Sequence, residues 1–183
     1  MFDLDRLQGL ADIPRAQAAA RPLATAQVFE ERRTSFAEFD RRTSQVAQGL
    51  IAAGLAPQAR IGFLGKNSDR YFELLFGAAK SRHVLVGINW RLAAPEIEYI
   101  LNDAGCTTVF VGAEYRAVIE EIRTRCPQLT HIVAMDGGHA AWPAFDDWRG
   151  AHTDADPGLP TRADDDVIQL YTSGTTGHPK GVQ

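Results

Sequence analysis

The chain has 183 residues, of which 45% are hydrophobic and 23% are charged, and it carries a formal net charge of −4. These values are typical of a globular protein with one core of ordinary size, and the acidic balance gives no support to nucleic-acid or anionic-membrane binding. The start of the chain, Met1–Asp5, lacks the basic and apolar regions of a signal peptide, and no apolar stretch reaches membrane-spanning length. We therefore expect a cytoplasmic protein without a transmembrane segment.

The first predicted elements are a helix over 14–20, with Pro14 in its first turn, and a strand over 24–30. The pair Arg32-Arg33 is predicted to form a tight turn. Acidic residues stand next to this pair and to Arg41-Arg42, so we interpret both pairs as parts of a solvated surface of mixed charge and not as an anion site.

The helix predicted over 36–53 has the clearest local signals in the chain. Ser35 and Glu38 have the spacing of a capping box. Gly54 provides the left-handed residue with which many helices end. We expect this helix to pack its apolar face into the core.

Beyond residue 59, short strands and helices alternate with short loops. Strands are predicted over 60–64, 84–88, 107–111 and 131–135, and helices over 67–81, 95–103 and 114–125. This alternation predicts an α/β fold with a mainly parallel sheet flanked by helices. Cys106 and Cys126, which have no C-x-x-C spacing, are expected to be ordinary reduced residues.

The pattern changes after Met135. Residues 136–165 are rich in Gly, Ala, Pro and Asp, with one predicted helical turn at 145–148. We predict an α/β subdomain over 1–135, a surface connection over 136–165, and a strand and loop over 166–183 that begin the next subdomain. The acidic run Asp164–Asp166 is interpreted as a solvated turn, with a metal site as the less favoured alternative.

The strongest signal is a strand over 167–171 that runs into a loop rich in glycine and hydroxyl groups. Glycines allow the backbone N–H groups to approach an anion closely, and hydroxyls and a lysine add further donors. The residues expected to bind a polyphosphate are Thr172, Ser173, Gly174, Thr175, Thr176, Gly177 and Lys180.

This loop differs from the Walker loop of nucleotide hydrolases. Pro179 precedes Lys180 where that motif has glycine, and no Ser or Thr follows the lysine to hold a metal. Gly181-Val182 favours a strand over a helix. We therefore predict a strand, a phosphate loop and a second strand.

The sequence Tyr-Thr-Ser-Gly-Thr-Thr-Gly-His-Pro-Lys-Gly-Val at 171–182 resembles the phosphate-loop signature of the adenylate-forming superfamily, which includes acyl-CoA synthetases. Weaker upstream motifs occur in the order seen in bacterial medium- and long-chain fatty acyl-CoA synthetases. They are Arg33–Phe39, Pro57–Gly65, Lys66–Ser68, Gly77–Lys80, Asn89–Leu92 and Pro95–Gly105. Ser81-Arg82-His83 departs from the small pair that the family commonly has there.

The resemblance implies an enzyme that activates a carboxylate, here a fatty acid, with Mg-ATP to an acyl adenylate and passes the acyl group to CoA. In such enzymes the loop binds the β- and γ-phosphates, and the magnesium ligand and the catalytic lysine lie beyond the equivalent of Gln183. We therefore expect an N-terminal fragment with no catalytic acid, base, nucleophile or metal ligand of its own, inactive alone and prone to self-association. Its partners would be fatty acid, ATP and CoA. A stand-alone nucleotide- or phosphate-binding module without catalysis and a remnant that only binds a partner protein are the alternatives.

The histidines and Trp90 are the remaining residues whose side chains could serve a binding site. His83, His131, His139, His152 and His178 show no metal-ligand spacing, and His178 is notable only for its place in the loop. Trp90 follows a predicted buried strand at its carboxyl end, where α/β sheets bind ligands, but packing of the loop is the favoured interpretation.

Overall fold

The computed structural model describes residues 7–160, 162–172 and 179–183. The chain divides into two compact units that interleave along the sequence. The described parts of Met1–Pro57, Asn67–His83 and Arg149–Val167 form the first unit, and Gln58–Lys66, Val84–Trp148 and the described parts of Ile168–Gln183 form the second. Each unit is thus assembled from segments that are distant in sequence.

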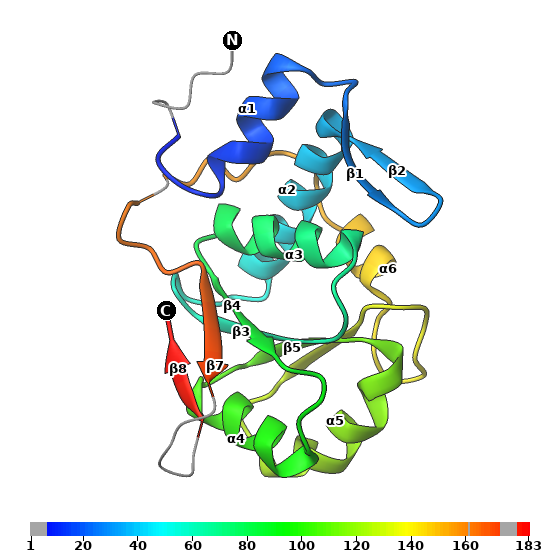
Figure 1. Cartoon of the computed structure of the whole chain (residues 1–183), viewed down its shortest axis with the longest axis vertical. Helices are drawn as coiled ribbons and strands as arrows, with labels where there is room; N and C mark the ends of the chain where they lie inside the picture. The colour runs from blue at the N-terminus through cyan, green and yellow to red at the C-terminus, as the bar shows by residue number, and fades with distance from the viewer. Residues whose placement is uncertain (1–6, 161, 173–178) are drawn as a thin grey trace. The chain divides into compact units, whose positions relative to one another are not determined.

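The first unit contains three helices and a hairpin among its described residues (Figure 1). They are α1 (Asp12–Ala20), β1 (Thr25–Phe29), β2 (Arg32–Ser35), α2 (Phe36–Ala52) and α3 (Asp69–Lys80). The predicted turn at Arg32-Arg33 is wrong, because these residues pair with Phe29 and Val28 in the antiparallel hairpin. The turn lies two residues earlier, at Glu30 and Glu31, where Glu30 has a positive φ of 53°.

Local signals place α2 as predicted. The Ser35 hydroxyl accepts a hydrogen bond from the Glu38 backbone N–H at 3.3 Å, and Gly54 after the helix has a φ of +73°. Only half of the capping box forms, because the Glu38 carboxylate pairs with Arg42 instead. Helices α2 and α3 pack against each other and supply most of the buried apolar side chains of this unit, Phe39, Val46, Ala47, Leu50, Leu74 and Ala78.

The second unit is built on a sheet of six strands among the described residues, in the order β6-β5-β3-β4-β7-β8. The strands are β3 (Arg60–Leu64), β4 (Val84–Ile88), β5 (Thr108–Val111), β6 (His131–Ala134), β7 (Ile168–Thr172) and β8 (Lys180–Val182). Neighbouring strands are parallel except β7 and β8. The α/β class and the mainly parallel sheet are confirmed.

The helices assigned to the remaining chain are α4 (Ala94–Asp103), α5 (Arg116–Ile122) and α6 (Phe145–Gly150), with 3-10 turns at Ala113–Tyr115 and Arg123–Arg125 on either side of α5. Side chains from the sheet, α4 and α5 form one apolar core, which includes Leu64, Val86, Ile88, Ile97, Leu101, Val109 and Ile119. Cys106 and Cys126 are buried in this core as free thiols. Burial raises the pKa of Cys106 to about 12.

Strand β7 enters this sheet beside β4, with Leu85, Val86 and Gly87 opposite Ile168, Gln169 and Leu170. In the structure β7 continues the sheet formed by β3 to β6. The reason is a long-range strand pairing, which local sequence patterns do not encode.

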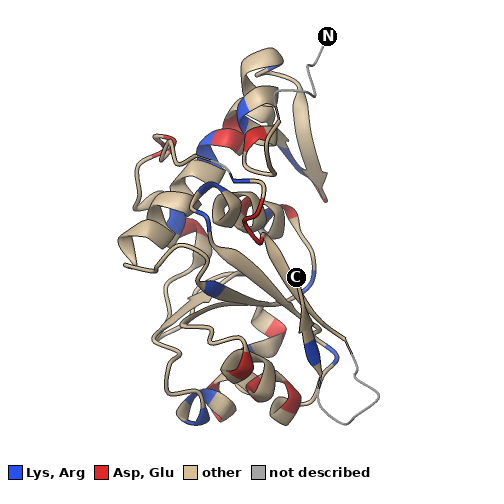
Figure 2. Cartoon of the chain, turned by 90° about the vertical axis from the view of Figure 1, so that its left-hand side faces the viewer, with Lys and Arg blue, Asp and Glu red and all other residues tan. Residues whose placement is uncertain are grey.

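No helix in the described part of the chain combines the length and the apolar character that crossing a membrane requires. Basic and acidic residues occur in both units (Figure 2): α2 and α3 carry both signs, whereas α4 carries only acidic residues and β2 only basic ones.

Candidate functional site

The two ends of the predicted phosphate loop are held side by side by a hairpin. Strands β7 and β8 are antiparallel, with Thr172 opposite Lys180, Tyr171 opposite Gly181 and Leu170 opposite Val182. The predicted strand after the lysine is therefore present, as β8. Of the expected binding residues, Thr172 and Lys180 are placed at the two ends of the loop, and Ser173–Gly177, together with His178, lie outside the described residues.

The hairpin opens at the carboxyl edge of the parallel sheet. Strand β7 runs parallel to β4, which runs parallel to β3, so the chain leaves Thr172 at the edge where open α/β sheets bind ligands. The side chains of both Thr172 and Lys180 are exposed there. A hydroxyl and an ammonium group at this edge can donate hydrogen bonds to an anionic ligand.

Trp90, which leaves the same edge after β4, has a packing role. Its ring lies against the core beside Tyr115, with ring centroids 6.1 Å apart. The Arg91 guanidinium carbon stands 4.0 Å from the Trp90 ring centroid, and Lys66 Nζ stands 5.4 Å from it. Lys66 is also paired with Glu114 at 2.8 Å. These contacts support the interpretation of Trp90 as a packed loop residue.

A line of polar side chains supports the hairpin from within the sheet. Arg60 Nε donates to Gln169 Oε1 at 3.1 Å, and Gln169 Nε2 donates to the Tyr171 hydroxyl at 3.2 Å. The Tyr171 hydroxyl in turn donates to Asp103 Oδ2 at 2.6 Å. Burial, reinforced by the Asp103 carboxylate, raises the pKa of Tyr171, so its hydroxyl stays protonated and remains a donor at neutral pH. We call these four residues the Tyr171 relay.

Sequence reasoning missed the Tyr171 relay. The one sequence signal for it is Gly181, because a glycine in a strand can mark a close approach of another group. A Cβ on Gly181 would lie 2.5 Å from Gln169 Nε2 and 3.3 Å from Tyr171 Cζ. Any side chain larger than glycine at position 181 would therefore force the Gln169 amide to shift.

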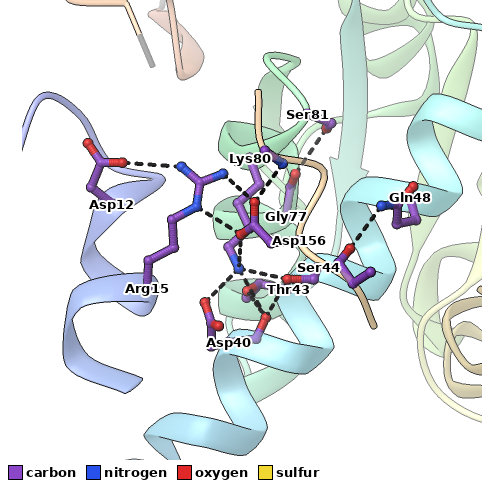
Figure 3. A network of polar contacts seen from close by, with 12 residues as sticks. Asp12, Arg15, Asp40, Thr43, Ser44, Gln48, Gly77, Lys80, Ser81 and Asp156 are labelled. Atoms are coloured by element: carbon purple, nitrogen blue, oxygen red, sulfur yellow. Dashed lines mark hydrogen bonds and ion pairs between the residues drawn. The ribbon is translucent and has the colours of Figure 1, made fainter. Parts of the chain in front are cut away.

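A second polar cluster, in the first unit, surrounds the buried ammonium group of Lys80 (Figure 3). Lys80 Nζ lies 2.6 Å from Asp40 Oδ1, 3.1 Å from Asp156 Oδ2 and 2.8 Å from Ser44 Oγ. Arg15 makes two hydrogen bonds of 2.8 Å to the Asp156 carboxylate. Each charge here has a partner of opposite sign, so the cluster is structural and joins α1, α2 and α3 to the segment that carries Asp156.

Glu73 of α3 forms a similar bridge. Its carboxylate is fully buried and accepts a hydrogen bond from Arg42 at 3.0 Å and another from Arg149. Arg32 makes two hydrogen bonds of 2.8 Å to the buried Asp69. Two of the arginines predicted to lie in a solvated surface, Arg32 and Arg42, therefore bind buried carboxylates. The spacing of the arginines in the sequence did not indicate these long-range pairs.

The acidic run before β7 is engaged in an ion pair. Asp165 accepts hydrogen bonds of 2.8 and 2.7 Å from Arg82, and the Arg82 hydrogen bond lowers the pKa of the Asp165 carboxyl. His83 is buried with its Nδ1 2.8 Å from the Ser81 hydroxyl. Within the described residues, no group of three or more His, Cys, Asp and Glu side chains is arranged to hold a metal ion.

Three comparisons with known proteins agree. The family described as AMP-binding enzyme matches residues 14–183. The chain is 42% identical to the fatty acid–(acyl-carrier-protein) ligase ScoC of Streptomyces coeruleorubidus over 97% of this chain and 33% of that protein. It is 36% identical to the long-chain-fatty-acid–CoA ligase FadD13 of Mycobacterium tuberculosis over 92% of this chain and 33% of that protein. The chain therefore spans about a third of the length of these relatives.

Solved structures show the same fold. The anthranilate CoA ligase AuaEII, crystallised with anthranoyl-AMP, superposes with a TM-score of 0.89 at 31% identity, over 94% of this chain and 34% of that one. The N-terminal domain of FACL13 from Mycobacterium tuberculosis, crystallised with an inhibitor, superposes with a TM-score of 0.86 at 32% identity, over 96% of this chain and 44% of that one. With a family match over residues 14–183 and a hairpin that presents Thr172 and Lys180 at the carboxyl edge of its sheet, the chain belongs to the AMP-binding enzyme family.

Proposed function

We propose that this chain supplies the phosphate-binding loop of an AMP-forming acid–thiol ligase. In the proposed reaction a carboxylate attacks the α-phosphorus of ATP, an acyl adenylate forms and pyrophosphate leaves. A thiol then attacks the acyl carbon, and AMP leaves. The observation that carries the proposal is the β7–β8 hairpin, which holds Thr172 opposite Lys180 at the carboxyl edge of a parallel sheet.

The role we assign to the loop is electrostatic. The Thr172 hydroxyl and the Lys180 ammonium would hold the β- and γ-phosphates, and Ser173–Gly177, which lie outside the described residues, would add hydroxyl and backbone N–H donors. Pyrophosphate carries more negative charge as it leaves, so donors fixed near it stabilise the transition state more than the ground state.

The proposed substrate is a fatty acid, and the proposed acceptor is CoA. The fatty-acid ligases ScoC and FadD13 among the relatives support the proposed substrate. These two relatives differ in the acceptor, because ScoC is named for an acyl-carrier protein and FadD13 for CoA. Mg²⁺ would accompany ATP and neutralise part of its phosphate charge. Within the described residues no carboxylate cluster is suited to this ion, so its protein ligand is proposed to lie elsewhere in the protein.

We further propose that these 183 residues do not form the adenylate by themselves. The chain spans about a third of the relatives' length, and none of its described residues is placed as a catalytic acid, base or nucleophile. Incubation with Mg-ATP, radiolabelled pyrophosphate and a fatty acid is expected to give no exchange of label into ATP. Exchange above the level of a protein-free control would contradict this part of the proposal.

Calorimetric titration with Mg-ATP tests the role of the loop. We expect Lys180→Ala to weaken binding by at least about tenfold, because a hydrogen bond to a charged group is lost. Lys66→Ala is the matched control: Lys66 also follows a strand at this edge, but its ammonium is already paired with Glu114, so binding should be unchanged. Equal binding by the Lys180→Ala variant and the wild-type chain would refute the loop's role. The alternative, a nucleotide-binding module without catalysis, also predicts tight Mg-ATP binding and no exchange of pyrophosphate label into ATP. Formation of acyl adenylate by the full-length protein would exclude that alternative.

A further inference from the structure

The position of Asp103 in α4 calls for an explanation. It is the last residue of the helix, where the partial negative charge of the helix end opposes a carboxylate, and the last turn of α4 contains no basic residue to offset it. The shortest contact that offsets this repulsion is the hydroxyl of Tyr171, which donates to Asp103 Oδ2 at 2.6 Å, while the Tyr99 hydroxyl lies 3.5 Å from Oδ1. A hydrogen bond to a charged acceptor of this length is among the stronger ones in proteins.

The hydrogen bonds of the Tyr171 relay all run in one direction. Arg60 donates to Gln169, Gln169 donates to Tyr171, and Tyr171 donates to Asp103. Since Arg60 lies in β3 and Asp103 ends α4, the relay ties β7 to a strand that is not its neighbour in the sheet and to the end of a helix. Gln169 is 7% exposed, so its amide has little water to replace these partners.

Strand β8 also passes close to the relay. The backbone at Gly181 approaches the relay so closely that an added Cβ would come within 2.5 Å of Gln169 Nε2. Gly181 is paired with Tyr171, and the next pair toward the loop is Thr172 with Lys180. Tyr171 is therefore one residue pair away from both ends of the loop.

We propose that Tyr171 is a positioning residue for the phosphate loop, and that its hydrogen bond to Asp103 holds the hairpin in the register that brings the Thr172 hydroxyl and the Lys180 ammonium together. This inference rests on the proposed function of the loop. The ring of Tyr171 packs against the apolar core, and that burial does not need the hydroxyl. We thus infer that the Tyr171 hydroxyl positions the loop, whereas the Tyr171 ring contributes to the apolar core.

The test is Tyr171→Phe, which keeps the ring and removes the donor. We expect Mg-ATP binding by the 183-residue chain to weaken by about tenfold, with the midpoint of thermal unfolding changed little. Tyr99→Phe is the matched control, because Tyr99 meets the same carboxylate through Asp103 Oδ1 at 3.5 Å but belongs to α4 and not to the hairpin. Its binding should equal that of the wild-type chain.

A second readout needs no nucleotide. Hydrogen exchange of the Gly181 and Val182 amides should be faster in Tyr171→Phe than in the wild-type chain and unchanged in Tyr99→Phe. Unaltered exchange in Tyr171→Phe would overturn the inference, whatever the binding result. A third outcome is faster exchange in Tyr171→Phe together with unchanged Mg-ATP binding in Lys180→Ala. That result would support the positioning of the hairpin by Tyr171 and refute the loop's role in binding phosphate.

The acceptor provides a third variant. Asp103→Asn keeps an oxygen that can accept from Tyr171 and should retain most of the ATP affinity, whereas Asp103→Leu should reproduce the loss seen with Tyr171→Phe. The double variant Tyr171→Phe/Asp103→Leu should be no weaker than either single variant, because both remove one and the same bond. Additive losses would mean that the two residues act separately, which would contradict the inference.

Discussion

Gly77 of α3 faces Val46 of α2 at a distance that leaves no room for a side chain. A Cβ on Gly77 would lie 2.4 Å from Val46 Cγ1 and 2.9 Å from the Thr43 backbone oxygen. We expect Gly77→Ala to lower the free energy of unfolding by about 3 kcal/mol, since α2 and α3 would have to separate. Gly150→Ala, where nothing lies within 4 Å of the added atom, should be close to neutral. Denaturant unfolding of both variants measures the difference, and a stable Gly77→Ala protein would show that the two helices can move apart cheaply.

Removing one charge from the Lys80 cluster should cost more than removing a surface charge from the same segment. Asp156→Asn leaves the fully buried Lys80 ammonium without one of its two carboxylates, and we expect a loss of about 2 kcal/mol in the free energy of unfolding. Asp154→Asn breaks an exposed pair with Arg41 at 3.6 Å and should cost below about 1 kcal/mol. Similar losses in the two variants would contradict a structural role for the cluster.

Acid should destabilise the fold through carboxylates whose pKa is lowered. Burial acts to raise the pKa of Asp156, but hydrogen bonds from Arg15, Gly158 and Lys80 hold it well below its usual range. The pKa of Asp69 is likewise lowered by Arg32 against the effect of burial. A group with a depressed folded pKa stabilises the fold above its unfolded value, here 3.8, and that stability is lost as pH falls through the folded pKa.

The free energy of unfolding should therefore fall as the pH drops below about 4. Urea titrations at pH 7, 4 and 3 measure this dependence. Asp156→Asn should show a shallower fall over the same range, because the variant has no carboxyl to protonate at that position. A slope identical to that of the wild-type chain would mean that other groups account for the acid sensitivity.

Local signals were sufficient for much of the fold. Ser35 and Gly54 mark the limits of α2 through contacts within a few residues, and apolar runs locate β3 to β7 as strands. The strand order could not be predicted, because the pairing of β7 with β4 is a long-range contact that no local pattern specifies. The same limit applies to the Tyr171 relay: the phosphate loop was recognisable from its residues, but Tyr171 and Asp103 are 68 positions apart.

Gly181→Ala should impair nucleotide binding without touching a phosphate-binding side chain. The new methyl group would displace the Gln169 amide, which lies 2.5 Å from the site of the added atom, and so break the Tyr171 relay. We expect a loss in Mg-ATP affinity of about tenfold, as for removal of the Tyr171 hydroxyl. Val182→Ala, on the same exposed strand, serves as the control and should bind normally. Normal binding by Gly181→Ala would show that the hairpin tolerates the displaced amide.

The two thiols should be inert in the folded chain. Burial raises the pKa of Cys106 to about 12, and burial likewise raises the pKa of Cys126, so the reactive thiolate is scarce at neutral pH. Iodoacetamide at pH 8 should leave both residues unmodified until urea unfolds the protein, and mass spectrometry of alkylated peptides measures this. Rapid labelling of either residue in the absence of denaturant would contradict the burial.

Because the segments of the first unit are far apart in the sequence, the partners of its buried charges are synthesised at different times. Glu73 is 76 residues upstream of Arg149, its second cationic partner. At a translation rate of roughly 5–20 residues per second, Arg149 is added about 4–15 s after Glu73. Until Arg149 has been added, Glu73 has Arg42 but not its second cationic partner, so the nascent first unit cannot form the complete charge cluster around this buried carboxylate.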